Sequence, residues 1–248
     1  MYKPPRFSHK GQNGRLLIVG GSKKYHGAPM LSILAARRFV DLVYFYPYES
    51  NDKLLYGIRT IPEVIVLDKL SRSDEFDCVL FGIGAGLAKK PKLISKILKE
   101  SKRLVVDGDG LRHIKGKIPK DAILTPHEGE FRMLFGMNGT KENVRAMAKK
   151  HNCIILKKDP KGDTISDGKR VKVNKTHNQG MTKGGTGDVL SGFVAALYCR
   201  NEAFESAYAA AKTVGKAGNL AKKKFGFNYA ASDLTEFLAL ALRTKKSA

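Results

Sequence analysis

The chain has 248 residues, of which 42% are hydrophobic, and this length and composition are ordinary for one globular domain with a sizeable core. Its formal net charge is +22, but the lysines are spread along the chain without a nucleic-acid-binding motif, so we favour a solvated basic surface over a nucleic-acid-binding patch. No apolar run reaches the roughly 18 residues of a membrane span, and the polar N-terminus has no signal-peptide core. We therefore expect a cytoplasmic protein that binds neither membranes nor nucleic acid.

Short apolar runs alternate with amphipathic stretches along the chain. In chain order, we expect a strand over residues 15–20, a helix over 28–40, strands over 42–46, 63–67 and 77–81, a helix over 90–100, and strands over 103–106 and 122–125. Next come helices over 129–135 and 140–150, a strand over 153–156, a hairpin of strands over 163–166 and 170–173, and helices over 187–199, 203–224 and 232–243. The hairpin is predicted from Asp167-Gly168, a pair that favours tight turns.

The predicted strands before the hairpin are continuously apolar, which is typical of strands that are covered on both faces. Their alternation with helices predicts an α/β fold with a mostly parallel central sheet and helices on both faces. The sequence contains no internal repeat and no Pro/Ser-rich linker, so residues 1–248 are expected to form a single domain.

Glycines and polar side chains follow several of the predicted strands. Their segments are GS at 21–22, GIGAG at 82–86, DGDG at 107–110, PHEGE at 126–130 and KK at 157–158. In an open α/β sheet, ligands bind at the carboxyl ends of the strands. Each segment alone is a weak signal, because glycine after a strand is usually only a turn. Together they predict a cleft that handles phosphate groups.

The segment GMTKGGTGDVLSG, residues 180–192, is the strongest chemical signal in the chain. Its glycines allow backbone N–H groups to surround an anion, and the N-terminus of the following helix adds the positive end of its dipole. Asp188 lies in the first turn of that helix. It fits two roles, a helix cap or a base that takes a proton from a hydroxyl beside the anion hole.

Five blocks of the chain, in order, are similar to those of a known family. They are VGGSKKYHGAPMLSILAARR at 19–38, GIGAGL at 82–87, VVDGDGL at 105–111, LTPHEGEFRMLFG at 124–136 and GMTKGGTGDVLSG at 180–192. The chain thereby resembles the ADP/ATP-dependent NAD(P)H-hydrate dehydratases, a branch of the ribokinase-like superfamily. The resemblance runs from about residue 15 to the last predicted helix.

The resemblance implies nucleotide repair. NADH or NADPH hydrated at carbon 6 of its nicotinamide ring is phosphorylated by ADP or ATP and then loses phosphate, with magnesium as the expected cofactor. Asp188 would be the base, and Gly185, Thr186 and Gly187 would form the anion hole. Ala28, Gly84, His127 and Asp188 would contact the hydrate. Gly187 and the run Lys157, Lys158, Asp159, Pro160 and Lys161 would hold the adenine nucleotide, and Glu130 would contact the metal through water.

Several alternatives stay open at this level. Glu130 can equally be an acid of a first helical turn, and His127 can be an exposed loop histidine. Asp107 and Asp109 have a weaker claim to the cleft. A small-molecule kinase of the same superfamily would use the same anion hole, and a basic nucleic-acid-binding protein is the third possibility. We expect a homo-oligomer, although the alanine-rich helix at 203–224 could also pack within one chain.

Overall fold

A single sheet forms the centre of the molecule. The computed structural model describes residues 1–243, and within them nine strands are hydrogen-bonded in the order β3-β2-β1-β4-β5-β6-β7-β8-β9. All neighbouring pairs from β3 to β7 are parallel, and only β7–β8 and β8–β9 are antiparallel. The strands are β1 (Arg15–Gly20), β2 (Leu42–Pro47), β3 (Val64–Val66), β4 (Cys78–Phe81), β5 (Leu104–Val106), β6 (Ile123–Leu124), β7 (Ile154–Lys157), β8 (Asp163–Ser166) and β9 (Val171–Asn174).

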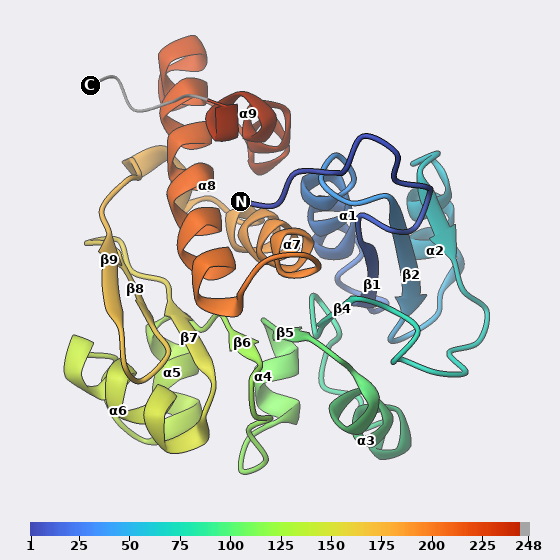
Figure 1. Cartoon of the computed structure of the whole chain (residues 1–248), viewed down its shortest axis with the longest axis horizontal. Helices are drawn as coiled ribbons and strands as arrows, with labels where there is room; N and C mark the ends of the chain where they lie inside the picture. Colours follow the sequence, from blue (N-terminus) through green and yellow to red (C-terminus); the bar gives the residue numbers. More distant parts are fainter. Residues whose placement is uncertain (244–248) are drawn as a thin grey trace.

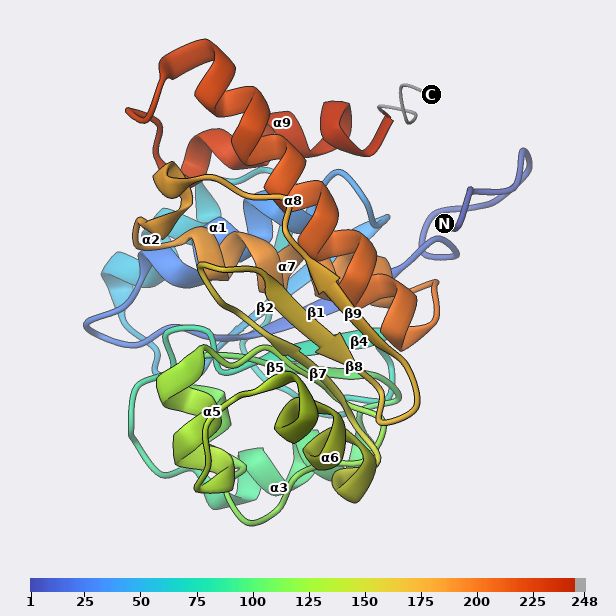
Figure 2. The same cartoon turned by 90° about the vertical axis from the view of Figure 1, so that its left-hand side faces the viewer.

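Helices cover both faces of this sheet, as Figures 1 and 2 show. One layer contains α1 (Gly27–Ala36), α7 (Thr186–Tyr198), α8 (Ala203–Phe225) and α9 (Ala231–Arg243), with α2 (Asp52–Arg59) beside β3. The other layer contains α3 (Pro91–Glu100), α4 (Asp109–His113), α5 (Glu128–Phe135) and α6 (Lys141–His151). The predicted α/β class, with a mostly parallel sheet between helices, is confirmed. No helix among residues 1–243 is long and apolar enough to cross a membrane.

The two-residue period of the strands divides the core into two parts. In β1, Leu16 and Ile18 pack into the cluster under α1, α7, α8 and α9, whereas Leu17 and Val19 pack into the cluster under α3–α6. All four side chains are fully buried. This two-sided burial explains why the strand reads as a continuous apolar run in the sequence.

The strand order reverses between β1 and β4. From β1 the chain adds β2 and β3 on one side, then returns to β4 and adds β5, β6 and β7 on the other. At such a point the connections that leave the two neighbouring strands run to opposite faces of the sheet, and α/β proteins bind ligands in the crevice that results. The glycine segment after β4 and the start of α1 after β1 therefore meet at a natural ligand site.

Most predicted elements are present within a few residues of their predicted ends. The hairpin is confirmed, with β8 and β9 paired antiparallel around Gly168, which has φ +87°. The first helix was predicted over 28–40, but α1 ends at Ala36, because the chain must turn before β2 begins at Leu42. Three short helical elements were not predicted, namely α2, α4 and a 3₁₀ turn over Gln179–Thr182.

The helices α1 and α7 pack with almost no space between their backbones. A Cβ atom added to Gly192 of α7 would lie 2.4 Å from the carbonyl oxygen of Ser32 in α1. That distance is far below van der Waals contact, so one helix would have to shift. The glycine at this position is therefore required by the packing of the two helices.

We predict that Gly192→Ala destabilises the protein by about 1–3 kcal/mol, because the added methyl group overpacks a backbone contact. Gly57→Ala is the matched control. Gly57 also lies inside a helix, but its added Cβ would meet only the flexible side chain of Met30 at 3.2 Å. Alanine favours helices over glycine by up to about 1 kcal/mol, so the control should not lose stability. Denaturant unfolding measures both, and equal stabilities for the two variants would contradict the packing argument.

Candidate active site

The N-terminus of α7 lies at the carboxyl edge of the sheet and carries unpaired backbone donors. Its N-cap, Gly185, has φ +94°, a conformation that favours glycine. Because glycine has no side chain, it cannot bond to the N–H groups of the first turn. The Thr186 hydroxyl donates to the carbonyl of Met181 at 2.8 Å, which ties the loop back on itself. Within residues 1–243, the N–H groups of Gly187 and Asp188 have no hydrogen-bond acceptor. Two free donors at a helix N-terminus can bind an anion.

Asp188 stands beside these donors. Its carbonyl oxygen accepts a hydrogen bond from Ser32 Oγ at 2.8 Å, which joins the first turn of α7 to α1. Its carboxylate, in contrast, accepts no hydrogen bond from any residue that the structure describes, so it does not cap the helix. Burial, reinforced by the charge of Asp107, raises the pKa of Asp188 to about 7. The arrangement leaves a partly buried acid poised to exchange a proton near neutral pH.

A lysine and two more carboxylates surround Asp188. Lys158, directly after β7, donates from Nζ to Oδ1 of Asp107 at 2.8 Å, and Asp107 directly follows β5. Burial alone would lower the pKa of Lys158, but the charges of Asp107 and Glu130 outweigh it and hold that pKa above its ordinary value. Burial raises the pKa of Glu130, and Asp107 adds to the effect. The segments that follow β5, β6 and β7 thus bring Asp107, Glu130 and Lys158 close to Asp188.

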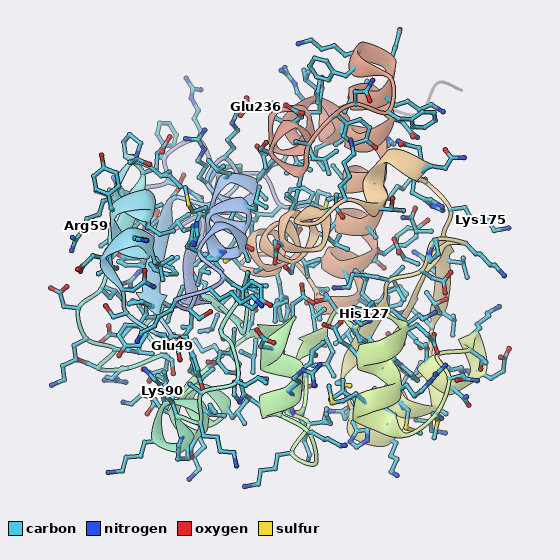
Figure 3. The ribbon with its side chains drawn as sticks, turned by 180° about the vertical axis from the view of Figure 1, so that it is seen from behind. Glu49, Arg59, Lys90, His127, Lys175 and Glu236 are labelled. Atoms are coloured by element: carbon cyan, nitrogen blue, oxygen red, sulfur yellow. The ribbon has the colours of Figure 1, made fainter. Side chains whose placement is uncertain are left out.

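His127 and Glu130 begin α5 with a reciprocal pair of hydrogen bonds. His127 Nδ1 accepts from the Glu130 N–H at 3.2 Å, and Glu130 Oε2 accepts from the His127 N–H at 2.8 Å. This pairing places the imidazole proton on Nε2, which faces Glu130 Oε1 at 3.6 Å. Glu130 is therefore an acid of the first helical turn and also a member of the charged group around Asp188. Figure 3 shows His127 at the end of α5 that points toward the layer of α7 and α8.

A pocket of about 540 Å³ opens beside the N-terminus of α7. Its walls include the predicted residues His127, Lys158, Asp159, Pro160, Thr186 and Gly187. The volume is typical of sites for small molecules and cofactors. Two residues predicted for the adenine nucleotide, Lys157 and Lys161, are not part of its walls. Lys157 instead forms ion pairs with Asp159 and, at 2.8 Å, with Glu128.

Several wall residues were not identified from the sequence. They are Asp163, Thr176, His177, Asn178, Gln179, Met181, Thr182, Leu190, Ala211 and Val214. Four of them form the continuous segment 176–179, to which the sequence analysis assigned no role. Burial raises the pKa of Asp163, whose carboxylate accepts hydrogen bonds from the Asp159 N–H at 3.2 Å and from Asn174 Nδ2 at 3.2 Å. Asp163 thus fixes the turn that carries Asp159 and Pro160.

Ala28 and Gly84 lie together at the reversal of strand order, outside the walls of this pocket. A Cβ added to Gly84 would lie 3.1 Å from Ala28 Cβ and 2.9 Å from Tyr25 Cβ, and Gly84 has φ +57°. Asp109 holds the same glycine segment, because its Oδ2 accepts from the Gly86 N–H at 2.8 Å. In the sheet order, β5, which Asp107 directly follows, lies between β4 and β7. The charged group of Asp107, Glu130, Lys158 and Asp188, which we call the Asp188 group, therefore lies between the glycine segment and the pocket.

No group of three or more His, Cys, Asp or Glu side chains among residues 1–243 is arranged to enclose a metal ion. Magnesium, however, usually keeps several waters and binds through one or two carboxylates together with substrate phosphates. Glu130 fits such a water-mediated contact, because only one of its oxygens is engaged by the His127 N–H. The three cysteines are free and buried.

The fold is that of a ribokinase-like α/β protein. It combines this strand order with the free donors of the α7 N-terminus at the carboxyl edge of the sheet. Residues 16–240 match the family described as NAD(P)H-hydrate dehydratase, and the chain belongs to this family. A solved structure with the same fold is the ADP/ATP-dependent NAD(P)H-hydrate dehydratase of Bacillus subtilis, co-crystallised with ATP and Mg²⁺. It superposes with a TM-score of 0.81 at 22% identity, over 97% of this chain and 93% of that one.

Two sequence relatives have archaeal sources. The ADP-dependent (S)-NAD(P)H-hydrate dehydratase of Cenarchaeum symbiosum is 37% identical over 96% of this chain and 91% of its own length. The bifunctional NAD(P)H-hydrate repair enzyme Nnr of Archaeoglobus fulgidus is 39% identical over 99% of this chain. The chain spans 54% of that bifunctional protein, about half of its length.

We predict that Asp188→Asn stabilises the folded protein at neutral and alkaline pH. The pKa of Asp188 is about 7 when folded and 3.8 ordinarily, so the unfolded chain loses this proton first as the pH rises. Stability therefore falls between these two pH values, by up to about 4 kcal/mol, and asparagine removes that cost. Denaturant unfolding should show the variant more stable at about pH 8 and equal to wild type at about pH 4.

Asp68→Asn, which neutralises an exposed acid, controls for the loss of one negative charge. A stability difference for Asp188→Asn that is the same at both pH values would show that Asp188 does not titrate in the way the structure indicates.

Proposed function

We propose that this protein restores NADH or NADPH from the (S)-form of its hydrate, using ADP or ATP as phosphoryl donor. The observation that carries the proposal is the Asp188 carboxylate, which is free of hydrogen bonds and follows Gly187, a residue that has an unpaired N–H group and lines a nucleotide-sized pocket. Asp188 itself is not one of the pocket walls. A base next to an anion hole is what transfer of a phosphoryl group to a hydroxyl requires. The names of the two relatives support the substrate, and the name of the Cenarchaeum symbiosum enzyme supports ADP as a donor.

The first step forms a phosphate ester on the hydrate. The Asp188 carboxylate takes the proton of the hydroxyl at carbon 6, and the hydroxyl oxygen attacks the terminal phosphorus of the donor. A new O–P bond forms while the bond from phosphorus to the leaving nucleotide breaks, which releases AMP from ADP. The N–H groups of Gly187 and Asp188 hold the oxygens of the transferred group, with Gly185 and Thr186 shaping the loop.

The second step expels the phosphate. The lone pair of the ring nitrogen drives cleavage of the bond from carbon 6 to oxygen, and inorganic phosphate leaves with that oxygen. Loss of a proton from the adjacent ring carbon then completes the double bond of NADH or NADPH. Hydrate and ADP enter, and reduced cofactor, AMP and phosphate leave, so the atoms balance. The second step distinguishes the proposed reaction from that of a kinase, whose product would retain the phosphoryl group.

The two substrates are assigned to the two sides of Asp188. Ala28 and Gly84, at the reversal of strand order, together with His127, would hold the hydrated dinucleotide. The pocket walls Asp159, Pro160 and Gly187 would hold the adenine nucleotide. Glu130 would hold magnesium through water, where the ion neutralises donor phosphates.

Lys157 and Lys161 were also predicted to bind the adenine nucleotide. We propose for them only a supporting role. Both contact Asp159, which lies in the turn that lines the pocket. A cytoplasmic location and a homo-oligomeric assembly remain predictions from the sequence.

The proposed function predicts that absorbance at 340 nm rises when the protein is mixed with NADH hydrate, magnesium and ADP or ATP. Asp188→Asn should reduce the rate by at least about 100-fold, because the base is lost while the anion hole remains. Phosphate release, measured in the same samples, should equal the NADH formed. A product that retains the phosphoryl group would instead indicate a kinase, and no rise with either nucleotide would overturn the proposed function.

The activity should also depend on pH. Because Asp188 must be ionised to act as base and its pKa is about 7, kcat/KM should fall about tenfold per unit as the pH drops below that value. A blank without enzyme corrects for spontaneous reaction of the hydrate. A profile that stays flat down to about pH 5 would mean that Asp188 is not the titrating base.

A further inference from the structure

The neighbours of Lys158 suit a contact with phosphate better than a contact with the adenine ring. Its Nζ lies 2.8 Å from Oδ1 of Asp107, and a Cβ added to Gly187 would lie 3.5 Å from the same Nζ. The ammonium group therefore lies against the first turn of α7, where the free N–H groups are. The side chain is also 21% exposed and forms part of the pocket wall, so a ligand in the pocket can reach it.

The neighbouring lysine shows that this placement is particular to Lys158. Lys157 is the last residue of β7, and successive side chains of a strand point to opposite faces. Lys157 accordingly pairs with Glu128 and Asp159, on the side away from α7. Of the two adjacent lysines, only Lys158 is directed to the Asp188 group.

Lys158 also has unused hydrogen-bonding capacity. An ammonium group has three N–H donors. One of them bonds to Asp107, and the structure gives Nζ no other acceptor among residues 1–243. Lys158 lines the pocket, and its Nζ lies close to Gly187, whose N–H is unpaired. A phosphate oxygen bound by that N–H would lie within reach of Lys158.

The charges of the site make this cation necessary for an anionic ligand. Asp107, Glu130 and Asp188 all act on Lys158, so the place where phosphate must enter carries more acids than bases. The side chain of Asp107 is only 4% exposed and cannot turn away into solvent. Without Lys158, the nearby side chains would offer a nucleotide phosphate only carboxylates, and the repulsion would be offset by backbone dipoles and any magnesium that accompanies the nucleotide.

We propose that Lys158 is a catalytic residue that contacts the terminal phosphate of the donor nucleotide, rather than its adenine ring. The inference rests on the proposed function and names the role of one residue in it. As the hydroxyl oxygen bonds to phosphorus and the bond to AMP breaks, negative charge moves to the bridging oxygen that leaves with AMP. Lys158, which lies against the first turn of α7, balances that charge.

The test compares the binding of ADP with that of adenosine, which has no phosphate. In Lys158→Met, which keeps the side-chain length but not the charge, ADP should bind at least about tenfold more weakly while adenosine binds as in wild type. Lys158→Arg should recover part of the ADP affinity. Calorimetry measures both ligands, and Lys150→Gln on the exposed face of α6 controls for the loss of one surface charge. The proposal would be overturned if Lys158→Met weakened the binding of ADP and adenosine equally, or left the binding of both unchanged.

Turnover provides the second readout. With saturating ADP and NADH hydrate, kcat of Lys158→Met should fall about 100-fold or more, because a donor to the developing charge is lost. A change in KM for ADP with unchanged kcat would contradict the catalytic role. The binding assay does not use the hydrate, so a wild-type protein inactive on the hydrate would overturn the proposed function and leave the inference on Lys158 to be decided by binding.

Removal of the Lys158 charge leaves Asp107 buried without its partner, and this can unfold the protein. The double variant Lys158→Met/Asp107→Asn neutralises both groups and avoids that cost. It should still bind ADP more weakly than wild type with adenosine binding retained, because the contact from Lys158 to the phosphate is lost even though one repelling carboxylate is also removed. If the double variant binds ADP as tightly as wild type does, Lys158 does not contact the phosphate.

Discussion

The contact between α1 and α7 determines where the reactive groups lie. Gly192 allows the two backbones to meet at Ser32, and the hydroxyl of the same serine donates to the carbonyl of Asp188. One residue of α1 therefore sets both the distance between the helices and the position of the first turn of α7. Because α1 directly follows β1, this turn is held over the carboxyl edge of the sheet at the reversal of strand order. The free N–H groups and the base are placed by helix packing rather than by a flexible loop.

The charged group around Asp188 is costly to the fold and useful to the chemistry. Partly buried carboxylates repel one another, and burial together with this repulsion raises the pKa values of Asp188 and Glu130. A protein selected only for stability would gain little from such a group. Its position, between a glycine segment suited to one ligand and a pocket suited to another, connects the electrostatic cost to a reaction between two bound molecules.

The fold could be predicted from the sequence because its strands are covered on both faces and so read as unbroken apolar runs. The hairpin of β8 and β9 was also predictable from its turn pair. The short helix α4 was not, because its five residues follow a strand end rich in glycine and contain too few turns for a helical period. The missed α2 is amphipathic and capped by Asn51, but it is only eight residues long, about two turns, which is too short to show a sustained helical period.

The site was predictable to different degrees in its different parts. The motif over 180–192 predicted a helix with Asp188 in its first turn, and the structure has α7 there without a side-chain cap. The role of Asp188 as base stays a prediction. The five contiguous residues 157–161 were treated as one set, although β7 extends through Lys157, and the alternation of its side chains separates the two lysines. Leu190 reaches the pocket from α7, and Ala211 and Val214 reach it from the next helix, α8. Their place in the pocket wall depends on how α7 and α8 pack, so no local sequence pattern predicts it.

The central claim is that the hydroxyl of the hydrate is itself phosphorylated. NADH hydrate labelled with ¹⁸O at the carbon 6 hydroxyl tests this claim in a single turnover experiment with ADP, followed by mass analysis of the phosphate released. The account predicts one ¹⁸O atom in each phosphate, because carbon–oxygen cleavage sends that oxygen out with phosphorus. Unlabelled phosphate, with the ¹⁸O recovered in water, would show that the nucleotide is hydrolysed separately and would contradict the account.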